Sequence, residues 1–131
     1  MVIDTSAIVV ILRDETERHV FDRLIQADGV RLVSAVTRVE AACVIEGRWG
    51  TAGRSGLEHF FRLTEAEIVV VTEEQAELAV GVFRRYGKGR HPAALNIGDC
   101  FSYALAKATG EPLLFKGNDF AQTDITPAYR A

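Results

Sequence analysis

The sequence predicts an α/β protein, a three-layer α/β/α sandwich with a mostly parallel central sheet. Short apolar runs typical of strands alternate with amphipathic helical segments, the order that builds a parallel sheet covered by helices on both faces. With 131 residues, 48% hydrophobic and 25% charged, the chain has the size and composition of one globular domain, and we expect residues 1–131 to form it.

The first elements follow from apolar residues and capping signals. Residues 1–4 are an apolar segment expected to form a strand. Thr5 or Ser6 is expected to cap a helix over 7–13. A second helix is predicted over 15–27, because its apolar residues recur at helical spacing and an Asp-Gly pair follows.

The middle of the chain is expected to contain two strands and two helices. A strand over 30–34 precedes a helix over 36–47, and three glycines indicate a loop over 49–56 before a helix over 57–66. The β-branched run 68–71 is typical of a fully buried strand. The expected core residues of the two helices are Val36, Val39, Cys43 and Val44, then Phe60, Phe61 and Leu63.

The last third alternates in the same way. An amphipathic helix is predicted over 73–86, followed by a basic loop over 88–95 that contains Gly and Pro. Asn96 is expected to cap a helix that runs to residue 108. A short strand over 112–115 precedes a polar loop, residues 117–124.

Composition narrows the class of protein. The longest apolar run is much shorter than the roughly 20 residues that cross a bilayer, and no basic segment precedes it, so we expect no membrane association. Cys43 and Cys100 lack the spacing of a zinc site or a disulfide framework, which favours the cytoplasm. A formal net charge of −3 argues against bulk electrostatic binding of nucleic acid unless cations bind first.

Four carboxylates stand beside apolar segments that should be buried: Asp4, Glu40, Asp99 and Asp119. Asp4 and Asp119 follow strands, and the other two lie in early helical turns, so all four could converge at the carboxyl edge of the sheet. Buried carboxylates are costly without a positive partner, and an all-oxygen set favours Mg²⁺ or Mn²⁺. Two such ions could drive phosphodiester hydrolysis by activated water.

Each acid also has a structural interpretation. Asp4 could be a turn residue and Asp119 part of an Asx-turn. The sole role of Asp99 could be to complement the dipole of its helix. Glu40 could form a salt bridge with Arg13 or Arg38.

Polar neighbours of these acids suggest further roles. Ser6 could hydrogen-bond a water or a phosphate oxygen, and Lys116 could meet a substrate phosphate. Lys88 and Arg90 are either solvated charges or RNA backbone contacts.

The segments Met-Val-Ile-Asp-Thr-Ser-Ala, Asn-Ile-Gly-Asp-Cys-Phe-Ser-Tyr-Ala and Leu-Leu-Phe-Lys-Gly-Asn-Asp-Phe, together with the Glu40 helix, resemble PIN-domain ribonucleases. More narrowly, the chain resembles VapC-type toxins of toxin–antitoxin pairs. The resemblance covers essentially the whole chain. It implies a PIN-like nuclease domain that acts as a Mg²⁺-dependent endoribonuclease, with Mn²⁺ as a substitute, on structured RNA such as tRNA or rRNA.

By this resemblance, the four carboxylates take the positions of the family's catalytic and metal-binding quartet, with Thr5 and Ser6 as its hydroxyl neighbours. Asp124 is a possible extra acid. The resemblance also implies a homodimer and a cognate VapB-like antitoxin. The rival hypothesis is a module with the same fold that binds RNA or protein without cleaving it, and the presence of all four acids argues against that rival.

Overall fold

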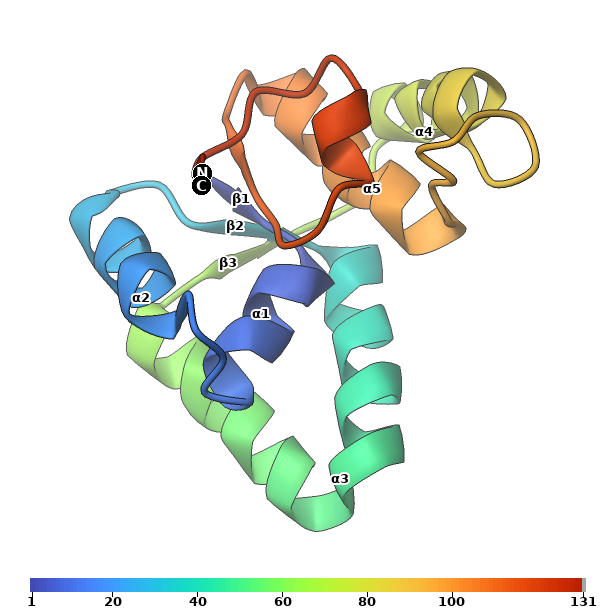
Figure 1. The fold of residues 1–131 in the computed structure, drawn as a ribbon. Coiled ribbons are helices and arrows are strands. Elements are labelled where there is room, and N and C mark those ends of the chain that lie inside the picture. Colours follow the sequence, from blue (N-terminus) through green and yellow to red (C-terminus); the bar gives the residue numbers. More distant parts are fainter. Residues whose placement is uncertain (131) are drawn as a thin grey trace.

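The computed structural model describes residues 1–130, and it has a sheet between two layers of helices (Figure 1). The strands are β1 (Val2–Ile3), β2 (Leu32–Ser34), β3 (Glu67–Val69) and β4 (Leu113–Leu114). Their order in the sheet is β3-β2-β1-β4, and each neighbouring pair is parallel. The predicted α/β/α sandwich is confirmed.

Three helices pack on one face of the sheet and two on the other, an arrangement that can be followed in Figure 1. The first group is α1 (Thr5–Leu12), α2 (Arg18–Ala27) and α3 (Ala35–Thr64), and the second is α4 (Glu73–Tyr86) and α5 (Ile97–Thr109). A short 3₁₀ helix, η1 (Phe120–Gln122), interrupts the polar segment expected over 117–124. None of the helices in residues 1–130 combines enough length with enough apolar character to cross a bilayer.

The strands are short, yet they divide the interior into two cores. Side chains that alternate along a strand point to opposite faces of the sheet. Accordingly, Ile3 and Leu114 pack with α1, α2 and α3, whereas Val2 and Leu113 pack with α4 and α5. Burial on both faces explains why β1 and β4 consist only of apolar residues.

The predicted loop over 49–56 is wrong. Helix α3 continues through this segment and bends sharply at Gly50, whose φ of 57° lies in the left-handed region. The two arms then pack closely, since a Cβ at Gly53 would stand 2.6 Å from the carbonyl oxygen of Ile45. The glycines therefore serve a kink and a close approach between helix arms.

Several expected core positions are also wrong. Val39 is 63% exposed and Cys43 is exposed, because α3 buries the face that contains Thr37, Ala41 and Ile45. In the second arm Leu63 is 69% exposed, whereas Phe60 is buried as expected.

The run 68–71 is not a fully buried strand. β3 ends at Val69 and lies at the edge of the sheet, and Val70 beyond it is 72% exposed. An edge strand has a neighbour on one side only, so its side chains receive less cover.

Helix ends differ from expectation at two places. The cap of α1 is Asp4, whose side chain accepts from the Ser6 N–H, rather than Thr5 or Ser6. Helix α2 begins at Arg18, three residues after the predicted start. Asp14 adopts a left-handed φ of 56°, which changes the direction of the chain before the helix. The predicted Asn96 cap of α5 is confirmed.

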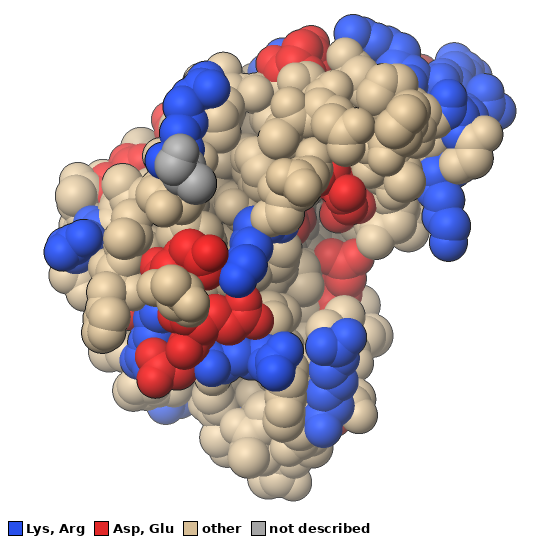
Figure 2. All heavy atoms as spheres, viewed as in Figure 1, with Lys and Arg blue, Asp and Glu red and all other residues tan. Residues whose placement is uncertain are grey.

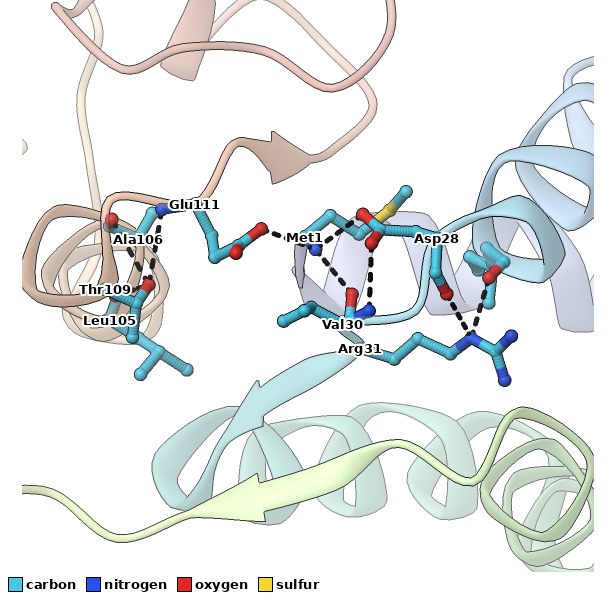
Figure 3. A network of polar contacts seen from close by, with 9 residues as sticks. Met1, Asp28, Val30, Arg31, Leu105, Ala106, Thr109 and Glu111 are labelled. Carbon is cyan, nitrogen blue, oxygen red and sulfur yellow. Dashed lines mark hydrogen bonds and ion pairs between the residues drawn. The ribbon is translucent and has the colours of Figure 1, made fainter.

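The amino group of Met1 joins three parts of the fold (Figure 3). It forms ion pairs with Asp28 at 2.8 Å and Glu111 at 2.9 Å, and it donates to the carbonyl oxygen of Val30. These contacts hold the start of β1 against the segments that enter β2 and β4.

Candidate acidic active site

A pocket of about 400 Å³ opens where β1 ends and α1, α3 and α5 meet. Asp4, Glu40 and Asp99 line it, together with the hydroxyl residues Thr5 and Ser6. Figure 2 shows acidic side chains in a hollow of the surface, with Lys and Arg side chains around it. The structure therefore brings three of the four predicted acids together at the expected edge of the sheet.

Asp4 is 2% exposed, and each of its oxygens has a hydroxyl partner. Oδ2 accepts from the N–H and the hydroxyl of Ser6, at 3.0 and 2.7 Å. Oδ1 accepts from the Ser102 hydroxyl at 2.6 Å, and Ser102 in turn lies 3.1 Å from the Thr37 hydroxyl. Asp4 is therefore the buried end of a chain of hydroxyl groups, with no cation among these partners.

Sequence reasoning missed Ser102. Its signal is a small polar residue three positions after Asp99, on a helix whose neighbouring residues are apolar and buried. Its partner Thr37 is likewise fully buried.

Replacing Ser102 with Ala should leave the buried Oδ1 of Asp4 without its donor. We expect a loss of about 1–3 kcal/mol in the free energy of unfolding. We also expect Mn²⁺ affinity to fall about 10- to 100-fold, because the carboxylate loses the group that orients it. Thermal melts and calorimetry measure the two effects. Ser55→Ala, at an exposed position of α3, is the control, and equal Mn²⁺ affinity in both variants would contradict the orienting role.

Glu40 points into the pocket from α3 and accepts from the Thr5 hydroxyl at 2.5 Å. Burial raises its pKa, the Thr5 hydrogen bond partly opposes this, and the charge of Asp4 raises it further. The alternative of a structural salt bridge is wrong, because Arg13 lies near Glu15 and Arg38 lies over the Phe61 ring.

Gly98, in the first turn of α5, makes room for Glu40. A Cβ at this position would overlap the Glu40 carboxylate. A larger residue must therefore push the carboxylate away from the pocket.

Replacing Gly98 with Ala should displace the Glu40 carboxylate while the fold persists, because the end of a side chain can move. We expect Mn²⁺ affinity to fall about tenfold, comparable with the loss of an orienting partner. Gly81→Ala in α4 is the matched control, since a Cβ there meets nothing within 4 Å. That control should gain about 0.5–1 kcal/mol of stability. Calorimetry that found the same affinity in both variants would show that Gly98 does not position Glu40.

Asp99 has two roles in the structure. Its Oδ2 accepts from the Asn96 N–H at 3.0 Å while Asn96 accepts from the Asp99 N–H at 2.8 Å, which completes a capping box. Burial raises the pKa of Asp99 to about 7 against the opposing Asn96 hydrogen bond. The negative charges of Asp4, Glu40 and Asp119 add to this rise in pKa.

The fourth predicted acid, Asp119, and the possible extra acid, Asp124, lie differently. Asp119 is exposed just before η1, and its charge reaches Asp99, although it does not line the pocket. Asp124 accepts from the Tyr103 hydroxyl at 2.6 Å and pairs with Lys107 at 3.3 Å. Burial acts to raise the pKa of Asp124, but these two partners lower it overall. The structure therefore places Asp124 in a contact with α5, outside the pocket.

The basic residues occupy two regions. Lys116 lines the pocket, but its ammonium group pairs with Glu15 at 2.8 Å and Glu17 at 3.0 Å. Lys88 and Arg90 lie in the loop between α4 and α5, where the Arg90 guanidinium stands over the Phe83 ring.

The donor set suits a hard divalent cation. Within residues 1–130, no three acidic, histidine or cysteine side chains already have the geometry to hold a metal ion. The carboxylates of Asp4, Glu40 and Asp99 nevertheless supply only oxygen donors, as Mg²⁺ and Mn²⁺ require. Burial, and to a smaller extent the neighbouring negative charges, raise the pKa values of Glu40 and Asp99, and a bound cation would offset both effects.

Comparisons with known proteins agree with this geometry. A family model described as the PIN domain matches residues 1–125. Ribonuclease VapC30 of Mycobacterium tuberculosis is 50% identical over 125 residues, 95% of each chain. Ribonuclease VapC of Mycolicibacterium smegmatis is 47% identical and covers 98% of this chain and 100% of its own.

Solved structures show the same fold at lower identity. VapC20 of Mycobacterium tuberculosis, described as a sarcin-ricin loop cleaving toxin, superposes with a TM-score of 0.77 at 17% identity, covering 99% of this chain and 98% of its own. A toxin–antitoxin complex from Klebsiella pneumoniae contains a chain with a TM-score of 0.67 at 20% identity, with the same coverage.

The fold and the acidic pocket define a PIN domain. The chain belongs to the PIN-domain family and, within it, to the VapC ribonucleases.

Proposed function

We propose that this chain is a Mg²⁺-dependent endoribonuclease whose single domain spans residues 1–131 and acts as the toxin of a toxin–antitoxin pair. The observation that carries the proposal is the convergence of Asp4, Glu40 and Asp99 on one open pocket, where none of the three carboxylates forms an ion pair within residues 1–130. The VapC ribonucleases at 47–50% identity support the same activity.

In this proposal Asp4, Glu40 and Asp99 hold the cation, and Asp119 completes or supports the set. Mg²⁺, or Mn²⁺ in its place, supplies an activated water and charge stabilisation for in-line displacement at phosphorus. Ser6 and Ser102 fix the Asp4 carboxylate from both sides, and Thr5 orients Glu40. Because these donors hold the carboxylates in place, little reorganisation is needed when the ion and the RNA bind.

We propose a structured RNA, such as tRNA or rRNA, as the substrate. The description of VapC20 as a sarcin-ricin loop cleaving toxin supports an rRNA substrate for a protein of this fold. The pocket is open to the surface, so a looped strand can reach it, as recognition of unpaired RNA requires.

We also propose a VapB-like antitoxin and a homodimer in the bacterial cytoplasm. The Klebsiella pneumoniae toxin–antitoxin complex supports the first. Val39 and Ile97, 63% and 74% exposed, form an apolar surface beside Glu40 that could be covered by either partner. We expect the antitoxin to place an Arg or Lys among the pocket carboxylates, where its charge would replace that of the metal.

Cleavage by the purified chain tests the activity. Ribosomal RNA and tRNA should be cut at discrete positions in Mg²⁺ or Mn²⁺, and left intact in EDTA. Co-expression with the antitoxin should block cleavage. Tight RNA binding with no cleavage in either metal would favour a binding module instead.

A further inference from the structure

Two arginines stand at the rim of the acidic pocket. Arg13, at the end of α1, and Arg48, on the first arm of α3, both line the pocket that contains Asp4, Glu40 and Asp99. Their guanidinium carbons lie 5.5 and 5.9 Å from the centroid of the Trp49 ring. Cation–π contacts at these distances restrict both side chains and orient them together.

The kink of α3 creates this arrangement. Arg48 and Trp49 are the last residues before Gly50, where the left-handed φ of 57° turns the chain back. Trp49 consequently lies against the end of α1, where it lines a shallow pocket with Leu12 and Arg13.

The two arginines are also the cations best able to meet an external anion. Within residues 1–130, Arg48 forms no ion pair, and the nearest carboxylate to Arg13 is that of Glu15, at 3.8 Å. Lys116, by contrast, is held by two glutamates, and their hydrogen bonds raise its pKa. A polyanion that approaches a chain of net charge −3 needs local positive charge beside the reacting phosphate.

We propose that Arg13 and Arg48, oriented by Trp49, bind the RNA phosphodiester next to the one that is cleaved. This inference rests on the proposed function. A guanidinium group donates two parallel N–H groups to one phosphate, and it does so best when its plane is already fixed. The scissile phosphate lies over the carboxylates, and its neighbour along the strand lies over the arginines. Lys116 contributes less, because its ammonium group is already paired.

The experiment measures RNA affinity against salt for Arg13→Gln, Arg48→Gln and the double variant. The probe is a fluorescein-labelled RNA hairpin in Mg²⁺, and binding is followed by stopped flow before cleavage proceeds, so that the cation neutralises the carboxylates while binding is separated from cleavage. Each lost phosphate contact should reduce the slope of log Kd against log[salt] by about 0.7–0.9 and weaken binding roughly tenfold. Trp49→Leu should weaken binding without changing the slope, since it removes the orientation and not the charge.

Three controls separate the possible causes. The double variant Arg54→Gln, Arg62→Gln makes the same charge change on the second arm of α3, away from the pocket, and should keep its slope. Mn²⁺ binding should not weaken in the Arg13→Gln, Arg48→Gln variant, because the change removes positive charge beside the pocket and no carboxylate. If that double variant does not fold, Arg48→Gln alone decides the question, because Arg48 is exposed and forms no ion pair within residues 1–130.

An unchanged slope in the Arg48 and double variants would overturn the inference, as would an equal loss in the Arg54, Arg62 control. Loss of antitoxin binding with RNA affinity retained would assign the arginines to a protein contact and would equally overturn it. Failure of the proposed function gives a different result, namely no RNA cleavage by the unaltered chain in Mg²⁺ or Mn²⁺.

Discussion

Replacing Asp4 with Asn should reduce RNA cleavage by at least about a thousandfold, because a metal ion contributes several kcal/mol to stabilising the transition state. Asn keeps the shape of the side chain. Its one oxygen can accept from the N–H and hydroxyl of Ser6, and its amide group can donate to the Ser102 hydroxyl oxygen on the other side. It lacks the charge that attracts the cation. We therefore expect a folded protein that binds Mn²⁺ weakly, as measured by calorimetry, and no longer arrests growth on expression.

Asp14→Asn is the matched control for this variant. Asp14 has a left-handed φ of 56°, which Asn tolerates well, and its side chain is 71% exposed in a contact with Arg18. Its cleavage rate and Mn²⁺ affinity should equal those of the unaltered chain, since exposed ion pairs contribute little. Full cleavage by Asp4→Asn would place the reaction elsewhere on the molecule.

Replacing Asp99 with Asn should stabilise the metal-free protein and make its stability less dependent on pH. The folded chain holds the Asp99 pKa at about 7, whereas the ordinary value is 3.8. Between these values the native state binds the additional proton, so the stability of the unaltered chain falls as pH rises from about 4 to about 7. Above about pH 7 the Asp99 carboxyl is ionised in both the folded and the unfolded chain, so it causes no further loss of stability. An Asn at this position has no such dependence and keeps an oxygen for the Asn96 N–H.

Melting temperatures in EDTA measure this effect. The melting temperature of Asp99→Asn should exceed that of the unaltered chain by an amount that grows as pH rises from about 4 to about 7. At pH 8 we expect at least about 1 kcal/mol, or roughly 4 °C. Mn²⁺ should reverse the order, because only the chain that binds the ion gains stability from it. A variant that melts lower at every pH would show that the capping box is the main role of Asp99.

Local signals in the sequence were sufficient to predict most of the helices and strands. The apolar segment before Asp4, the Asn96 cap three residues before Asp99 and the helical periodicity of 15–27 each depend on residues close together in the chain. The positions of Asp4, Glu40 and Asp99 at strand ends and helix starts then predicted their convergence, because parallel strands end at one edge of the sheet.

The contacts between side chains distant in the sequence, and the face that each helix buries, could be determined only from the tertiary structure. Ser102 and Asp4 are 98 positions apart, and Lys116 meets Glu15 across 101 positions, so no local pattern predicts either contact. The same applies to the buried face of α3, which Thr37, Ala41 and Ile45 form rather than Val39 and Cys43.

The helical hairpin of α3 is the clearest case in which local sequence preference predicts the wrong structure. Three glycines in residues 49–56 indicate a loop by local preference, because glycine disfavours a helix interior. Packing against α1 and between the two arms outweighs that preference, and only Gly50 leaves helical geometry. The sequence by itself determined the α/β/α architecture and the identity of the acids. Tertiary packing decided which side chains hold those acids and which cations remain available beside them, because burial and pairing depend on residues distant in the chain.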